Sequence, residues 1–233
     1  MSKIMDYSVL FEQMFGVSNP AKNAGTMGGR IKVSDLSSPS VQAQLKAAGI
    51  DTNSAQYKTV IGDMLSANNG GIGYTNIQAI KNRMRYYDED GDHINQAFGV
   101  SGLTVTDKNL ASKNRIISIS EDIRDEMFEL TKREFLQENG VPNGETTKRS
   151  DIYRKMYPSI AKQDRLAAGH TLGEYEKQYL QAFKDAVKAA DPTWKEGKPI
   201  PAGVLDKITR ESVEAALTQS DGKLVKKGFN TTI

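Results

Sequence analysis

Apolar residues recur at intervals of three and four positions over most of this chain, the spacing that places side chains on one face of an α-helix. The clearest example runs from Leu172 to Ala190, where leucine, tyrosine, phenylalanine, valine and alanine fall on one stripe. Weaker stripes of this kind lie at about residues 39–48, 53–66, 76–84, 119–138 and 150–157. The sequence therefore predicts a mainly α fold, an irregular helical domain with short connections.

Short motifs indicate where some of these helices begin. A serine or threonine followed three residues later by glutamate or glutamine is typical of a capping box, in which the two residues satisfy the first free amides of a helix. The pairs are Thr75 with Gln78, Ser118 with Glu121, and Thr171 with Glu174. We expect a helix to start at each of the three.

The helical spacing weakens between Ile94 and Ile119. Residues 102–108 alternate as a strand does, and residues 114–120 are rich in β-branched side chains. This region is the one place where we expect a β element, and the predicted fold contains at most one small β-hairpin.

Composition divides the chain into three predicted parts. Residues 1–37 are expected to be a mobile N-terminal segment that carries a short amphipathic helix at residues 6–16 and then a linker rich in Ser, Asn and Gly. Residues 38–219 are expected to form the helical domain, and residues 220–233 a flexible tail.

Charge and hydropathy argue against two classes of partner. Lysine and arginine number 31 and aspartate and glutamate 29, a net charge of +2 spread along the chain, so the sequence offers no basic field to attract nucleic acid. No apolar stretch approaches the roughly 20 residues that cross a bilayer, so we expect no membrane span. The more favoured partner is another protein.

The chain has no cysteine, which excludes disulfides, thiolate nucleophiles and cysteine-bound metals. The N-terminus lacks the features of a cleaved secretory signal. Localisation therefore stays open between the cytoplasm and export by a route other than the general secretory one.

The common enzyme motifs are not present. No glycine stands at the required spacing before either Gly-Lys pair, so there is no P-loop, and Gly99 and Gly102 are one residue too close for a nucleophile elbow. His93 and His170 are the only histidines, and neither belongs to a metal or catalytic motif. Catalytic residues are therefore not assigned, and the chain is expected not to be an enzyme.

One acidic segment carries a candidate metal site. Asp88, Asp90 and Asp92 alternate after a predicted helix, as the first three oxygen donors of a helical calcium loop do. Two features depart from that pattern, since Gly91 stands at position 4 rather than 6 and Gly99 occupies position 12, where a bidentate glutamate belongs. The alternatives are a calcium ion bound by these three carboxylates and a solvated acidic turn.

The segments AGIDTNSAQYKTVI, GYTNIQAIKNRM and YYDEDGDHI resemble a bacterial domain family of unknown function from gut Clostridia, of the Eubacterium rectale type. The resemblance covers most of residues 40–190. It implies no activity, cofactor or site residue, because none is established for that family.

Three hypotheses about function follow from the sequence. The first is a non-enzymatic helical interaction protein, exported without a cleaved signal, in which residues 6–16 serve as a partner-binding or an export element. The second is a calcium-binding module that uses the Asp88–Asp92 loop, with Ca²⁺ as the one candidate cofactor. The third is an enzyme whose site the sequence does not reveal.

Overall fold

The computed structural model describes residues 29–67, 73–142, 144 and 148–227. The chain divides into two compact units, Met1–Gln96 and Ala97–Ile233, called unit 1 and unit 2 below. The boundary falls inside the segment 38–219 that the sequence assigned to one domain. The predicted amphipathic helix at residues 6–16 lies outside the described residues.

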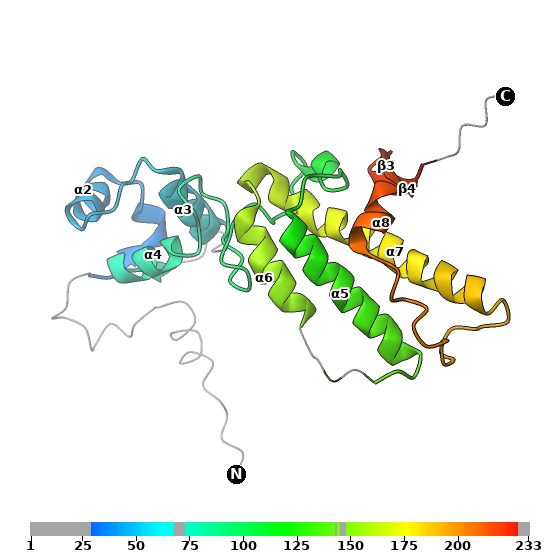
Figure 1. Ribbon diagram of the computed structural model, residues 1–233. Helices are drawn as coiled ribbons and strands as arrows, with labels where there is room; N and C mark the ends of the chain where they lie inside the picture. The colour runs from blue at the N-terminus through cyan, green and yellow to red at the C-terminus, as the bar shows by residue number, and fades with distance from the viewer. Residues whose placement is uncertain (1–28, 68–72, 143, 145–147, 228–233) are drawn as a thin grey trace, which may run out of the picture. The chain divides into compact units, whose positions relative to one another are not determined.

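The described residues form seven α-helices and four short strands, so the prediction of a mainly α fold is confirmed (Figure 1). Unit 1 contains β1 (Ile31–Lys32), α2 (Pro39–Ala47), α3 (Ala55–Ala67), β2 (Tyr74–Thr75) and α4 (Ile77–Met84). Unit 2 contains α5 (Glu121–Glu138), α6 (Arg149–Ser159), α7 (Arg165–Ala190), α8 (Arg210–Ala215), β3 (Leu217–Ser220) and β4 (Lys223–Lys226).

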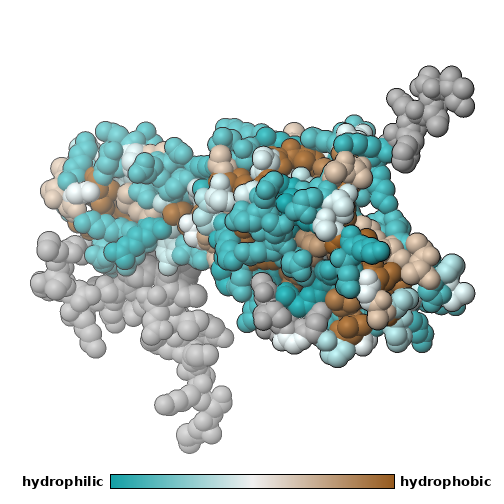
Figure 2. Space-filling view, viewed as in Figure 1, coloured by the Kyte–Doolittle hydropathy of each residue, from teal (hydrophilic) through white to brown (hydrophobic). Residues whose placement is uncertain are grey.

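No helix in these described ranges is both long enough and apolar enough to cross a membrane. In the view of Figure 2 the surface is mostly hydrophilic, and its hydrophobic residues form separate small patches. The most exposed large apolar side chains come from distant parts of the sequence: Leu65, Tyr86, Val105, Leu110 and Val225.

The strands form two antiparallel pairs, β1 with β2 and β3 with β4, and neither lies in the region 94–119 where the sequence predicted a hairpin. That region is described throughout and contains no strand, only turns, isolated bridge residues at Asn95 and Val100, and one short 3-10 helix. One reason is that the amide of Ile117 donates to the Thr171 hydroxyl on α7, at 3.1 Å, so its hydrogen bond is made with a helix side chain.

The β3–β4 hairpin occupies residues 217–226, which includes the start of the predicted flexible tail. Its two-residue turn is Asp221-Gly222, and both residues have positive φ, +47° and +69°. An Asp-Gly pair with this backbone matches the right-handed twist of two antiparallel strands, which makes it a strong hairpin signal.

The core of unit 1 lies between α2, α3 and α4. Leu36, Leu45, Val60 and Ile80 are fully buried in it. Ile31 and Val33 join Leu36 in this core although all three belong to the segment 1–37 that the sequence set apart as mobile. Their alternation with polar residues places them on the inner side of β1 and of the 3-10 turn that follows it.

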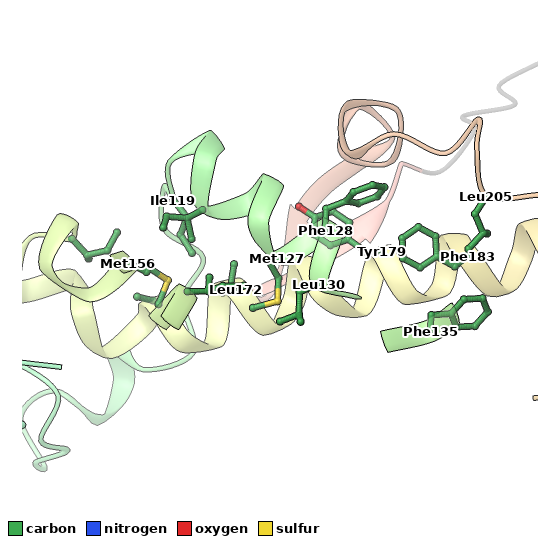
Figure 3. Close-up of a cluster of buried hydrophobic side chains, with 14 of the residues drawn as sticks. Ile119, Met127, Phe128, Leu130, Phe135, Met156, Leu172, Tyr179, Phe183 and Leu205 are labelled. Atoms are coloured by element: carbon green, nitrogen blue, oxygen red, sulfur yellow. The ribbon is translucent and has the colours of Figure 1, made fainter. Parts of the chain in front are cut away.

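The core of unit 2 is built mainly where α7 packs against α5 and α6 (Figure 3). Tyr179 and Phe183 of α7 are fully buried, and Phe128 of α5 meets both rings edge-on, with centroids 5.2 and 5.3 Å away. Edge-to-face pairs of this kind stabilise a core by about 0.5–1.5 kcal/mol beyond the area that they bury. The prediction of a strongly apolar stripe from Leu172 onward is therefore confirmed.

The three capping boxes are not where these helices begin. Helix α7 starts at Arg165, so Thr171 lies within it and uses its hydroxyl for the contact with Ile117. Helix α4 is capped by Asn76, whose side chain accepts from the Ala79 amide, and α5 begins after Ser120. For Thr171 and Glu174 the prediction failed because both side chains make tertiary contacts, with Ile117 and with Leu224.

A cluster of buried charges joins three helices of unit 2. Glu214 of α8 accepts hydrogen bonds from Arg124 of α5, from Arg210 of α8 and from the hydroxyl of Tyr179 of α7. Burial and the neighbouring Glu214 both raise the pKa of Tyr179, so its hydroxyl remains a donor at any ordinary pH. Two guanidinium groups thus bind one carboxylate. The side chain of Arg124 is 15% exposed, that of Arg210 7% and that of Glu214 12%.

Replacing Glu214 by alanine should destabilise unit 2 by about 3–5 kcal/mol, because it leaves two buried guanidinium groups without their shared acceptor. Glu211→Ala on the same helix is the matched control, since Glu211 is 67% exposed and should cost about 0–1 kcal/mol. Urea unfolding followed by the fluorescence of Trp194, a buried side chain of unit 2, measures both. Equal costs for the two variants would contradict a stabilising role for the cluster.

Removal of residues 1–36 should unfold unit 1, whereas removal of residues 1–28 should leave it folded. The two truncated proteins differ by residues 29–36, of which Ile31, Val33 and Leu36 are buried in the core. Each buried aliphatic side chain contributes about 1.5–3 kcal/mol. Their summed loss approaches the whole stability of a small unit. Hydrogen exchange of the α3 amides is the measurement, and equally slow exchange in both chains would show that residues 29–36 are dispensable.

Candidate metal centre

The acidic loop that follows α4 brings its three predicted ligands together. One carboxylate oxygen from each of Asp88, Asp90 and Asp92 lies within 4.8 Å of the others. Asp88 is half-buried, and Asp90 and Asp92 are exposed. Among the residues that the structure describes, this is the one group of three or more acidic or histidine side chains that could converge on an ion.

Main-chain hydrogen bonds close the loop at its base. The Asp88 amide donates to the Asp92 carbonyl at 2.9 Å, and the Ile94 amide donates to the Tyr86 carbonyl at 2.8 Å. Tyr87 and His93 face each other in an isolated antiparallel bridge, with their rings edge-on at 5.6 Å. The acidic residues therefore occupy the tip of a closed turn whose ends are fixed to each other.

The Asp88 carboxylate is oriented by the loop itself. Its Oδ1 accepts from the amides of Asp90, at 3.1 Å, and Asp92, at 2.8 Å. These bonds hold the Asp88 side chain against the main chain of the loop. One of its carboxylate oxygens then lies within 4.8 Å of an oxygen of each of the other two aspartates. An aspartate that folds the backbone around its own carboxylate in this way is common in turns, with or without a metal.

Gly91 explains why the loop departs from the calcium pattern at position 4. Its φ is +83°, and a Cβ at this position would lie 2.5 Å from Thr59 Oγ1 and 2.9 Å from the Ala55 carbonyl oxygen. Only glycine fits a backbone that is both left-handed and this close to a neighbouring helix. The turn is therefore seated directly on the first half of α3.

Two further side chains of α3 hold the segment that leads into the loop. Gln56 Nε2 donates to the carbonyl oxygens of Met84, at 2.8 Å, and Tyr87, at 2.7 Å. The Tyr87 hydroxyl donates to Asp63 Oδ2 at 2.5 Å. Burial raises the pKa of Tyr87, and the hydrogen bond and charge of Asp63 raise it further, so the tyrosine keeps the proton that this contact needs.

The spacing of the carboxylates is compatible with one calcium ion. Ca²⁺ binds oxygen at 2.3–2.6 Å, so two ligands of one ion can be no more than about 4.6–5.2 Å apart. The three carboxylate oxygens lie within that limit. Gly99, at position 12, has no side chain to contribute the two oxygens of the usual glutamate, so the remaining ligands would be main-chain carbonyls and water.

Each histidine has its own local contacts within its unit. His93 is exposed in unit 1 beside Tyr87, and His170 lies on α7 in unit 2, where its Nε2 is 2.6 Å from the Gly222 carbonyl oxygen. His170 thus contacts the turn of the β3–β4 hairpin. This contact is a structural role that could not be predicted from local sequence patterns.

Sequence reasoning identified the three aspartates but missed the residues that hold them. Gln56, Thr59 and Asp63 lie about 30 positions upstream, and their polar side chains fall on the outer face of α3 by periodicity alone. The one sequence feature that pointed to this contact was Gly91. A glycine at position 4, where the calcium pattern does not require one, indicated a backbone conformation that needs glycine.

Replacing Gly91 by alanine should destabilise unit 1 by about 2–4 kcal/mol, because the new methyl group meets α3 and the backbone is strained. Gly49→Ala is the control, since Gly49 also has positive φ, +79°, but open space around it, and should cost about 1 kcal/mol. Thermal unfolding of both variants provides the comparison. If the two substitutions cost the same, the close contact between the loop and α3 does not contribute to stability.

Comparison with known proteins identifies one family. The profile of a domain of unknown function, DUF3879, matches residues 50–233, which include α3, the acidic loop and all of unit 2. No curated protein and no solved structure matches the chain. Since the match covers well over half of the sequence, the chain belongs to the DUF3879 family of domains of unknown function.

Proposed function

We propose that this protein is a non-enzymatic calcium-binding module and that the ion binds at the Asp88–Asp92 loop. The observation that supports the proposal is the convergence of three carboxylate oxygens within 4.8 Å at the tip of a closed turn. Asp88, Asp90 and Asp92 are the proposed ligands. In this proposal Gln56 and Gly91 hold the loop against α3, so the ligands need little reorganisation to receive an ion.

Electrostatics favours a divalent cation at this position. Asp88, Glu89, Asp90 and Asp92 place four negative charges within five residues. A Ca²⁺ ion in contact with three carboxylates would relieve the repulsion between these charges directly, and hard oxygen ligands of this kind favour Ca²⁺ over softer metals.

The ligand set predicts weak binding. Without a glutamate at position 12, the loop lacks a bidentate ligand, so we expect a dissociation constant near 10⁻⁴ M, at the strong edge of the range of extracellular calcium modules. Such a site would fill at millimolar calcium and stay empty at the much lower concentrations of a cytosol. The proposal therefore agrees with the hypothesis of an exported interaction protein, which remains a separate hypothesis about this family member.

The test is thermal unfolding with about 5 mM calcium against EDTA. At a dissociation constant near 10⁻⁴ M, mass action should stabilise unit 1 by about 2 kcal/mol. Calorimetric titration of the native protein with calcium, and separately with magnesium, measures the affinity directly. We expect magnesium to bind more weakly, because it demands shorter and nearly octahedral coordination.

Two variants of the same loop separate a specific site from general charge attraction. Asp90→Asn removes one proposed ligand and should abolish most of the stabilisation. Glu89→Gln removes the same unit of charge from the neighbouring position, outside the group of three, and should leave binding within a few-fold of the original. Loss of the calcium effect in both variants, or in neither, would reject the site and leave the loop as a solvated turn.

A further inference from the structure

The β3–β4 hairpin has one edge covered by α7 and one edge open. Its register pairs Ser220 with Lys223 and Gln219 with Leu224. With a two-residue turn, Ser220 and Lys223 exchange main-chain hydrogen bonds, and the pattern then alternates along an antiparallel ladder. The amide and carbonyl groups of Leu224 therefore point outward from β4, and those of Leu217 and Gln219 point outward from β3.

Side chains of α7 satisfy the outer edge of β4. The Leu224 amide donates to Glu174 Oε2 at 3.4 Å, and the Leu224 carbonyl accepts from Gln178 Nε2 at 2.7 Å. Glu174 and Gln178 are one turn apart on the helix. Their side chains provide the acceptor and the donor that a neighbouring strand would otherwise offer to Leu224. These two contacts also confirm which way the alternating groups of the hairpin point.

The outer edge of β3 has no such cover in the part of the chain that the structure describes. No described residue forms a hydrogen bond with the outward amide or carbonyl groups of Leu217 and Gln219. Thr218 and Gln219 are exposed. The sequence of the strand, Leu-Thr-Gln-Ser, contains neither a charged residue nor a proline, two features that usually protect an edge.

We infer that β3 is a self-association surface, on which the β3 strand of a second copy of this chain pairs in antiparallel orientation. Around a two-fold axis at Thr218, Leu217 of each copy stands opposite Gln219 of the other. Both pairs can then exchange two main-chain hydrogen bonds, four in all. The reciprocity arises because the outward residues lie symmetrically on either side of Thr218.

The symmetric register around Thr218 assigns a second copy to this edge, and charge does not oppose it. The lysines of the hairpin, Lys223 and Lys226, lie on β4, and in the paired sheet the two β4 strands would be three strand spacings apart, about 14 Å. That distance exceeds the screening length of about 8 Å at physiological salt, so the lysines do not oppose pairing. The residues that meet directly are uncharged in both copies.

Because β3 has only four residues, the association is weak and depends on concentration. We expect a dissociation constant on the order of 1 mM, since four solvent-accessible hydrogen bonds supply little net affinity. Raising the protein from about 0.05 to 1 mM should increase the dimeric fraction about sixfold, by mass action at that dissociation constant. The readout is sedimentation equilibrium together with amide chemical shifts, where Leu217 and Gln219 should move most.

Two substitutions test the edge without removing the hairpin. Gln219→Pro deletes an outward amide that makes no bond to β4, and Thr218→Lys keeps every main-chain group but places like charges directly opposite each other in the dimer. Both should abolish the concentration dependence, and Gln219→Thr, which retains the amide, should preserve it. An unchanged Leu224 amide signal shows that the hairpin is still docked on α7.

A protein that stays monomeric to 1 mM with unmoved Leu217 and Gln219 amides overturns the inference. Self-association that survives in both Gln219→Pro and Thr218→Lys overturns it as well, because the dimer would then form elsewhere. If Gln219→Pro alters the Leu224 signal, Thr218→Lys decides the matter, since it leaves the backbone intact. None of these outcomes depends on calcium, so the experiment is run in EDTA.

Discussion

The packing of α7 is the constraint on which the rest of unit 2 depends. Tyr179 and Phe183 bury its inner face against α5, and the Tyr179 hydroxyl reaches the Glu214 charge cluster on α8. Polar side chains of the same helix form hydrogen bonds with the main chain of non-helical segments. Thr171 accepts from the Ile117 amide, and Glu174 and Gln178 bond to the amide and carbonyl groups of Leu224 in β4. A single 26-residue helix thus organises an apolar core on one side and main-chain hydrogen bonds on another.

This double use of α7 explains what sequence reasoning could and could not predict. The apolar stripe from Leu172 to Val187 is a local pattern, and it predicted the helix and its buried face correctly. Thr171 and Glu174 looked like a cap because the capping motif is defined by local spacing, whereas their partners, Ile117 and Leu224, are about 50 residues away in the sequence. Long-range polar contacts leave no periodic signal, so the start of α7 at Arg165 was missed.

The same distinction applies to the acidic loop. The alternation of Asp88, Asp90 and Asp92 lies within five residues, and a closed turn is enough to bring the carboxylates together, so the group could be predicted from sequence. The seat of the loop on α3 could not. Gln56 binds two carbonyl groups near the end of α4, and nothing in a glutamine on a helix surface indicates which main chain it will meet. Strands β1 and β2 escaped prediction for a related reason, since they have two residues each and pair across about 40 positions.

The family match covers only part of the core of unit 1. Recognisable similarity begins at Ile50, yet the core that α3 and α4 share is completed by Leu36 and Leu45, which lie upstream of that point. The apolar faces of α3 and α4 would be open to solvent without these side chains. In this chain the core around Tyr57, Val60 and Ile80 is therefore completed by side chains that lie upstream of the family match. The family match to this chain thus begins about 20 residues after Ile31, which already belongs to the described core of unit 1.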